Sequence, residues 1–342
     1  MKRILTLILL LAICFLISFK TGEAKENLDG NNPELNAEAS NLLELARKSC
    51  EKREYDKAIE YYIKILKSEP AFYTGYFELG QVYYYKRDYN KAFENLNKCI
   101  ELNSQFAPAF NERGILYGIM KEYDRALEDF NAALKIDPKY SLPYYNIGYL
   151  YYLNKEYKKA LENLNKSLEL NPEHKNSINI KGICYLRLKE YDRALECYNA
   201  VLKIDSKDYW AYYGIASVYF EKRDYKKALE YLNKSLELNT KFIPVFNLKG
   251  NCYVKLKEFD KALECYNTSL GKNPDSDGTL YNLACYYSLM NNNSKSLEYL
   301  EKAVEKGFDD YNHMESDTDL DNIRNESKYK SLIAILKEKA KK

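Results

Sequence analysis

Residues 190–198 read EYDRALECY, and this segment decides the fold because close copies of it recur along most of the chain. Each copy carries a small residue at its fifth position, and successive small residues are 34 positions apart without an insertion. These residues are Ala58, Ala92, Ala126, Ala160, Ala194, Ala228, Ala262 and Ser296. A fixed period of this length indicates stacked repeats, in which each unit packs only against its neighbours.

A second small residue lies twelve positions before each of these, and in seven of the eight copies a tyrosine follows it three positions later. The second small residues are Ala46, Gly80, Gly114, Gly148, Gly182, Ala216, Gly250 and Ala284. In one copy Tyr144, Ile147, Gly148 and Tyr151 share one helical face. Proline ends four copies, at Pro70, Pro138, Pro172 and Pro274. The pattern predicts two helices per copy that approach closely where small residues face large rings, with a turn such as Lys155-Glu156 between them.

The order of large residue, small residue, tyrosine, alanine and proline at a 34-residue period resembles the tetratricopeptide repeat. The resemblance covers residues 39–310 and departs from the family at Ser49, at Ser296 and at the turn glycine, which is Lys or Arg in most copies. It implies an all-α, right-handed superhelical solenoid of helix-turn-helix repeats. The expected repeats are 39–72, 73–106, 107–140, 141–174, 175–208, 209–242, 243–276 and 277–310.

Residues 311–342 are expected to form a C-terminal capping helix. Tyr329, Leu332, Ile333 and Leu336 fall on one helical face, while lysines follow at the end of the segment. Such a cap covers the apolar end of a solenoid and keeps it soluble.

The first 24 residues have the pattern of an export signal. Met1-Lys2-Arg3 precedes the uncharged stretch 4–19, which is shorter than a usual membrane-spanning helix. We expect cleavage after Ala24, and two alternatives stay open: an uncleaved membrane anchor, or lipidation at Cys14. All three place the repeats outside the cytoplasm, in the cell envelope or beyond it. Residues 25–38 are polar and are expected to be a linker.

The composition excludes several functions. Of the 342 residues, 52 are Lys or Arg and 50 are Asp or Glu, and the net charge of +2 argues against nucleic-acid binding. The two histidines are too few for a metal cluster, and the sequence has neither a phosphate-binding glycine loop nor a nucleophile elbow. We therefore expect no enzyme activity, no metal and no cofactor.

The family resemblance implies a concave groove, lined by the first helix of each repeat, that binds a protein or a peptide. Tyrosine and tryptophan provide large contact areas for such recognition. The candidate residues are Phe77, Tyr84, Asn111, Ile115, Tyr145, Tyr149, Tyr152, Asn179, Ile183, Trp210, Tyr213, Phe220, Asn247, Asn251 and Tyr281. The alternative is that many of these rings pack between repeats. The positions lack the Lys, Arg and Asn set with which some family members hold a C-terminal carboxylate, so no acidic-tail ligand is expected.

Further interpretations remain open at this level. Asn111, Asn179 and Asn247 alternate with rings in the even repeats, which indicates either a duplicated 68-residue unit or an alternating groove lining. Cys184 with Cys197, and Cys252 with Cys265, are either stapling disulfides or small buried residues. The protein is expected to be an exported scaffold with a role in envelope assembly; a non-catalytic subunit of an envelope enzyme complex and a self-assembling solenoid are the alternatives.

Overall fold

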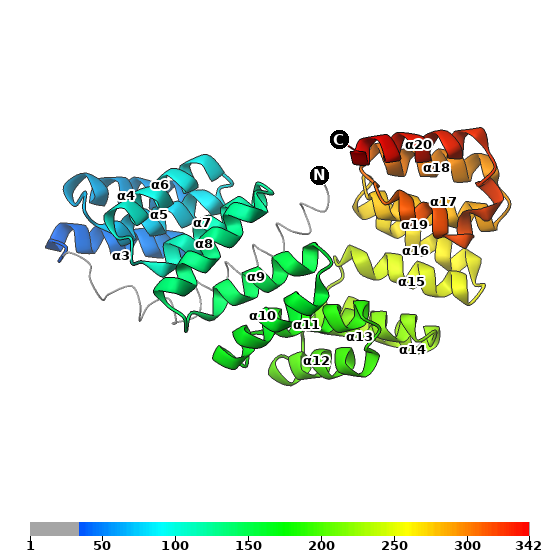
Figure 1. Cartoon of the computed structure of the whole chain (residues 1–342), viewed down its shortest axis with the longest axis horizontal. Coiled ribbons are helices and arrows are strands. Elements are labelled where there is room, and N and C mark those ends of the chain that lie inside the picture. Colours follow the sequence, from blue (N-terminus) through cyan, green and yellow to red (C-terminus); the bar gives the residue numbers. More distant parts are fainter. Residues whose placement is uncertain (1–33, 342) are drawn as a thin grey trace. The chain divides into compact units, whose positions relative to one another are not determined.

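The computed structural model describes residues 34–341, which contain helices and no β-strand (Figure 1). The predicted all-α fold is confirmed. The export signal predicted at residues 1–24 lies outside the described residues. No helix within residues 34–341 is both long enough and apolar enough to cross a bilayer.

The helices form consecutive hairpins, and we call the first helix of each hairpin the A helix and the second the B helix. The A helices are α3 (Ala37–Glu51), α5 (Tyr73–Tyr85), α7 (Ala107–Ile119), α9 (Ser141–Leu153), α11 (Lys175–Arg187), α13 (Tyr209–Glu221), α15 (Ile243–Lys255) and α17 (Asp277–Leu289). The B helices are α4 (Tyr55–Ser68), α6 (Tyr89–Leu102), α8 (Tyr123–Ile136), α10 (Tyr157–Leu170), α12 (Tyr191–Ile204), α14 (Tyr225–Leu238), α16 (Phe259–Lys272) and α18 (Asn293–Glu305).

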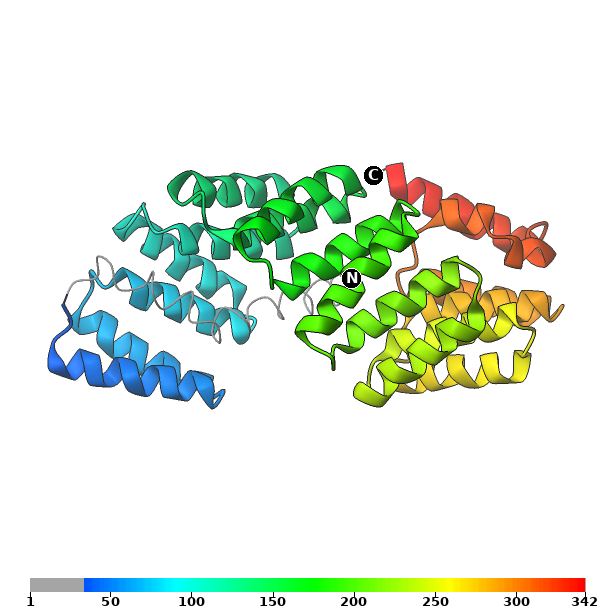
Figure 2. The ribbon, with the colours of Figure 1, turned by 90° about the horizontal axis from the view of Figure 1, so that it is seen from below.

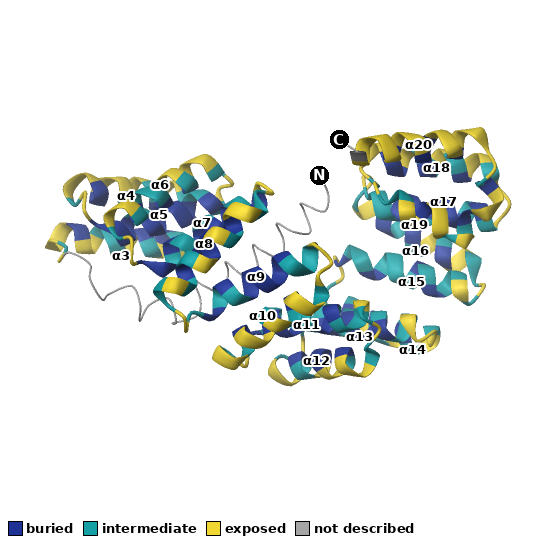
Figure 3. Ribbon diagram, in the orientation of Figure 1, coloured by how far each residue is buried: buried dark blue, intermediate teal, exposed yellow. Residues whose placement is uncertain are grey.

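The chain forms two compact units that divide between Ile180 and Lys181, inside α11. Within each unit a B helix packs against its own A helix and against the A helix that follows (Figures 1 and 2). Buried residues concentrate on the A helices, while the B helices keep one exposed side (Figure 3). This is the arrangement in which one hairpin covers the apolar face of the next.

Each hairpin closes where a small residue meets a large side chain. A Cβ added at Gly250 would lie 2.7 Å from Cζ of Tyr266, and one added at Gly148 would lie 2.9 Å from Cγ of Leu164. The predicted ring is present at this position in the odd-numbered repeats, as Tyr62, Phe130, Tyr198 and Tyr266. Leucine replaces it in the even repeats, as Leu96, Leu164, Leu232 and Leu300.

The turn inside each hairpin passes through one residue in the left-handed backbone region. The φ angles lie between 58 and 64° at Arg53, Arg87, Lys121, Lys155, Lys189, Arg223, Lys257 and Asn291. This conformation costs a non-glycine residue about 1–2 kcal/mol. Hydrogen bonds across the turn hold it closed, for example from the amide of Glu156 to the carbonyl oxygen of Tyr151 at 2.9 Å. Arg, Lys and Asn all adopt this conformation, so the position in the repeat, and not the residue type, determines the positive φ angle.

Three elements end the C-terminal unit: the short helix α19 (Tyr311–Ser316), the short 3₁₀ helix η1 (Thr318–Ile323) and the longer helix α20 (Ser327–Lys341). Tyr329, Leu332, Ile333 and Leu336 are all buried and share one core with residues of α17 and α18. The predicted apolar face of the capping helix is confirmed. The structure adds α19 and η1, which precede that helix.

The seven described cysteines are free thiols. Cys184 and Cys252 are fully buried, and burial raises the pKa of each thiol to about 12. These residues are therefore small apolar packing groups, as one of the two interpretations of the sequence expected.

Candidate functional site

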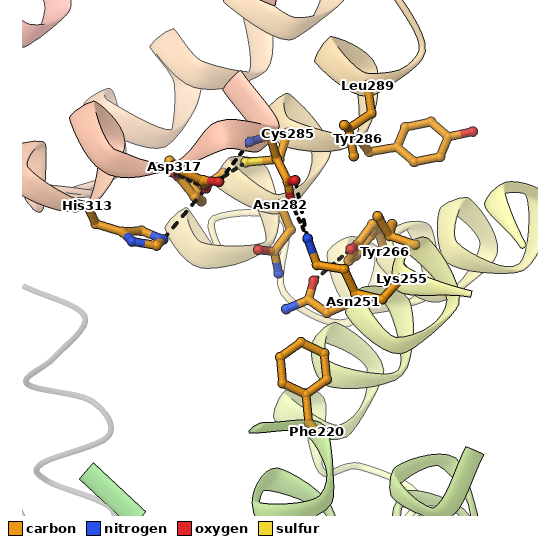
Figure 4. Close-up of a pocket in the computed structure, with 13 residues that line it drawn as sticks. Phe220, Asn251, Lys255, Tyr266, Asn282, Cys285, Tyr286, Leu289, His313 and Asp317 are labelled. Atoms are coloured by element: carbon orange, nitrogen blue, oxygen red, sulfur yellow. Dashed lines mark hydrogen bonds and ion pairs between the residues drawn. The ribbon is translucent and has the colours of Figure 1, made fainter. Parts of the chain in front are cut away.

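The C-terminal unit contains a cavity of about 220 Å³ between three A helices and the segment that follows the last repeat (Figure 4). The helices α13, α15 and α17 form one side, and α19 with η1 forms the other. Three of the predicted groove residues, Phe220, Asn251 and Tyr281, line this cavity. Predicted residues from successive repeats therefore meet around one space in this unit.

Two side-chain amides lie in the cavity wall. Oδ1 of Asn251 accepts a hydrogen bond from the hydroxyl of Tyr266 at 2.7 Å, which fixes the amide plane. Asn282 is half-buried one repeat further on and also lines the cavity (Figure 4). An asparagine amide offers both donors and an acceptor, so this pair can bind the N–H and C=O groups of an extended backbone.

An acidic corner closes the other side of the cavity. Nζ of Lys255 contacts both carboxylate oxygens of Asp319, at 3.0 and 3.2 Å. The hydroxyl of Tyr281 donates to Oδ2 of Asp317 at 2.7 Å, and Nε2 of His313 lies 3.7 Å from the same oxygen (Figure 4). Two carboxylates against one ammonium leave this corner acidic.

The nucleophilic groups at the cavity are held in their protonated form. Burial and the neighbouring Asp317 raise the pKa of the Cys285 thiol well above its usual value. Burial also raises the pKa of the Tyr281 hydroxyl, with the thiol and Asp317 adding to the effect. A thiol reacts through its thiolate, so this cysteine is not poised as a nucleophile. No group of His, Cys, Asp and Glu within residues 34–341 could hold a metal ion.

The other predicted residues of the C-terminal unit lie in internal contacts. Trp210 and Tyr213 on α13 pack against Phe242, with ring centroids 4.6 and 5.2 Å away. Oδ1 of Asn247 accepts from the hydroxyl of Thr279 on the next A helix at 2.9 Å. The structure thus separates these residues from the cavity and uses them to join successive repeats.

In the N-terminal unit the predicted rings of the A helices pack against other aromatic rings. Phe77 meets Phe106 edge-to-face at 5.1 Å. Tyr149 lies 6.2 Å from Tyr145 and 6.0 Å from Tyr152, and Tyr84 lies 5.9 Å from Tyr89. Ring packing and ligand binding both use such surfaces, so these residues remain groove candidates.

The predicted amides of the same unit differ in their partners. Oδ1 of Asn111 accepts from Nδ2 of Asn146 at 2.8 Å, which joins α7 to α9. Oδ1 of Asn179 is buried and meets no donor among the described residues. Two of the three alternating asparagines, Asn111 and Asn247, therefore link one repeat to the next.

Sequence reasoning missed the polar half of the cavity, which consists of Lys255, Asn282, His313, Asp317 and Asp319. The last three lie in residues 311–323, which have no 34-residue counterpart in the repeats. The cluster DTDLDN at 317–322 was the available signal, because acidic and amide residues there follow the last regular repeat directly.

Stacked two-helix hairpins of constant length define a helical-repeat scaffold. Profiles of the tetratricopeptide repeat match residues 73–106, 107–140 and 278–305, and the profile of the tetratricopeptide repeat protein 21 N-terminal ARM repeat matches residues 126–263. The chain belongs to the tetratricopeptide repeat family. Members are protein–protein interaction scaffolds that bind protein or peptide partners and are typically non-catalytic.

Solved structures support the same fold. The chain superposes on a structure described as the APC/C hetero-tetramer Cut9–Hcn1 with a TM-score of 0.60 at 17% identity, covering 86% of this chain and 55% of that one. It superposes on PilF of Pseudomonas aeruginosa with a TM-score of 0.53 at 20% identity, covering 62% of this chain and 96% of that one. The chain therefore spans about half the length of the first of these relatives. The comparison with curated proteins gave no match.

Proposed function

We propose that this protein is an exported scaffold that binds an extended segment of a partner protein along its A helices. The observation that carries the proposal is the cavity of the C-terminal unit, where Phe220, Asn251 and Asn282 from three successive A helices line one space. A ring and two amides offer an apolar surface together with hydrogen bonds to a peptide backbone.

The size of the cavity supports a peptide rather than a small-molecule ligand. Pockets for cofactors and drug-sized ligands usually measure about 300–1,000 Å³. The cavity measures about 220 Å³, so it suits a single side chain of a longer segment. No cofactor is therefore part of the proposal.

The charges at the cavity favour a neutral or basic segment over an acidic tail. Lys255, the one ammonium in the cavity wall, is already bound to Asp319 at 3.0 Å. Asp317 adds a further negative charge. A C-terminal carboxylate would meet repulsion here, which agrees with the absence of a carboxylate-binding set from the sequence.

Selection of peptides on the purified protein tests the groove. We expect the double variant Asn251→Ala/Asn282→Ala to bind the selected peptides at least about tenfold more weakly, because each lost amide removes hydrogen bonds worth about 1 kcal/mol. The measurement is fluorescence anisotropy with labelled peptides. Peptides that bind the double variant as tightly as the unmodified protein would exclude this cavity as the binding site.

Asn267→Ala is the matched control. Asn267 is an exposed asparagine on the B helix α16 of the same unit and does not line the cavity. Its replacement is expected to leave peptide affinity unchanged. A parallel loss in this variant would mean that the effect is not specific to the groove.

Export is the second part of the proposal, and it is supported by the sequence pattern of residues 1–24. Native cells are expected to yield the protein in the envelope or extracellular fraction, with Lys25 as its first residue. Fractionation followed by amino-terminal sequencing measures both. An intact Met1 in the cytoplasmic fraction would disprove export, and a lipid on Cys14 would replace cleavage after Ala24 by the lipoprotein alternative.

A further inference from the structure

Three carboxylates are buried in the described chain, and two of them are paired with an arginine. Glu78 accepts from Nε and Nη2 of Arg47 at 3.0 and 2.5 Å, and Asp129 accepts from Nε and Nη2 of Arg113 at 2.7 Å. The third is Glu112 on α7, which is 2% exposed and whose Oε2 meets no donor among the described residues. Buried carboxylates are rarely left without a partner.

Glu112 occupies the same repeat position as Glu78, 34 residues later, so the two surroundings can be compared directly. The preceding repeat supplies both partners of Glu78, namely the guanidinium of Arg47 and the hydroxyl of Tyr62, which donates at 2.6 Å. The counterparts of these two residues before Glu112 are Gln81 and Leu96. Both are uncharged and smaller. The chain therefore supplies an arginine to Glu78 but no cation to Glu112, one repeat later.

A second unpaired acceptor lies on the next A helix, at the repeat position that corresponds to Glu112. Nδ2 of Asn146 on α9 donates to Oδ1 of Asn111 at 2.8 Å, and Asn111 directly precedes Glu112 on α7. Oδ1 of Asn146 is buried and meets no donor among the described residues. Two consecutive A helices, α7 and α9, thus each carry a buried side-chain oxygen without a hydrogen-bond donor, and the Asn111–Asn146 bond joins the two helices.

We propose that Glu112 and Asn146 form a subsite for the guanidinium group of an arginine side chain in the partner segment, an inference that rests on the proposed function. An arginine presents five N–H donors in a planar fork, which suits two acceptors on adjacent helices better than the single ammonium of lysine does. The contact of Arg47 with Glu78 shows how a guanidinium meets a carboxylate at this repeat position in the same molecule.

The test titrates the ¹⁵N-labelled protein with N-acetyl-arginine amide and follows the side-chain amide signals of Asn111 and Asn146. The citrulline analogue has the same shape without the charge, and the lysine analogue has the charge without the fork. We expect saturable shifts with the arginine probe and affinities at least about tenfold lower for the other two probes. Glu112→Gln is expected to reduce arginine affinity by at least about tenfold.

Glu128→Gln is the matched control, because Glu128 is an exposed carboxylate on the neighbouring α8. It is expected to bind the arginine probe as the unmodified protein does. Absence of a saturable shift, equal binding of the citrulline or lysine probe, or unchanged affinity in Glu112→Gln would each overturn the arginine subsite. The Glu112→Gln signals themselves report whether that variant is folded.

The double variant Asn251→Ala/Asn282→Ala separates the two proposals. Loss of selected peptides with a retained arginine response supports both sites. An arginine response without any effect of the double variant on peptides overturns the C-terminal groove alone. If the double variant binds the selected peptides more weakly but the arginine probe causes no saturable shift, the arginine subsite alone is overturned.

Discussion

At pH 7, Glu78→Gln is expected to destabilise the folded protein by about 2–4 kcal/mol, whereas Glu112→Gln is expected to stabilise it by about 1–2 kcal/mol. The two replacements are chemically identical and occupy the same repeat position. The first removes the partner of Arg47, whose side chain is 35% exposed, so water recovers only part of the lost interaction. The second removes a buried acid that no cation of the described chain neutralises.

The pH dependence of the Glu112 effect has a defined sign. Burial raises the pKa of the Glu112 carboxyl well above its usual value, while in the unfolded chain a glutamate has a pKa of about 4.3. Above that pH the unfolded state loses the proton that the folded state keeps, so the free energy of unfolding falls as pH rises toward the folded-state pKa. Glutamine does not titrate. The advantage of Glu112→Gln is therefore expected to be small near pH 4 and to grow toward pH 8.

Urea unfolding of both variants at several pH values measures these effects, with the exposed Glu128→Gln as a control expected to change stability by less than about 0.5 kcal/mol. Equal destabilisation by Glu78→Gln and Glu112→Gln would show that Glu112 has a partner as good as Arg47. A stabilisation by Glu112→Gln that does not change between pH 4 and 8 would contradict the titration argument.

The hairpins could be predicted because they depend on local and repeated information. A small residue at one position and a large one sixteen positions later specify a close helix pair, and eight copies repeat the pattern. The expectation of a ring opposite every small residue was too general, because leucine stands at the ring position in alternate repeats. Leu164 packs against Gly148 at the position where Tyr266 packs against Gly250, so the period of the packing is 68 residues at this contact.

The candidate site was less predictable because it depends on contacts between repeats. Helical periodicity places Trp210 and Tyr213 on an exposed face, but Phe242 follows the next B helix and covers them. The cation on Glu78 comes from Arg47, 31 residues earlier, and only the stacking of α3 on α5 brings the two together. The acidic corner has no repeat counterpart at all.

Gly250→Ala is expected to destabilise the protein by about 1–2 kcal/mol and to weaken peptide binding at the C-terminal cavity. The added Cβ would lie 2.7 Å from Cζ and 2.8 Å from Cδ1 of Tyr266, a ring that is 2% exposed. Overpacking of this kind typically costs about 1–3 kcal/mol and exceeds the roughly 1 kcal/mol that alanine gains in a helix. The ring cannot swing aside freely, because its hydroxyl is bound to Asn251 at 2.7 Å.

The expected mechanism is a forced separation of α15 from α16, and three comparison variants test it. Gly271→Ala adds the same methyl group where no atom beyond the local helix backbone and the adjacent residues lies within 4 Å, so a stabilisation of up to about 1 kcal/mol is expected. Gly250→Ala/Tyr266→Leu reproduces the pair Ala216 with Leu232 of the preceding repeat and should recover most of the stability lost in Gly250→Ala. Tyr266→Leu removes the hydroxyl that is bound to Asn251. Peptide affinity should therefore fall both in Tyr266→Leu and in Gly250→Ala/Tyr266→Leu. Thermal unfolding measures the change in stability, and the anisotropy assay measures the change in peptide affinity. Equal melting temperatures for Gly250→Ala and Gly271→Ala would show that the hairpin accommodates the methyl group without loss of stability. The first repeat has such a pair, with Ala46 and Tyr62 both buried.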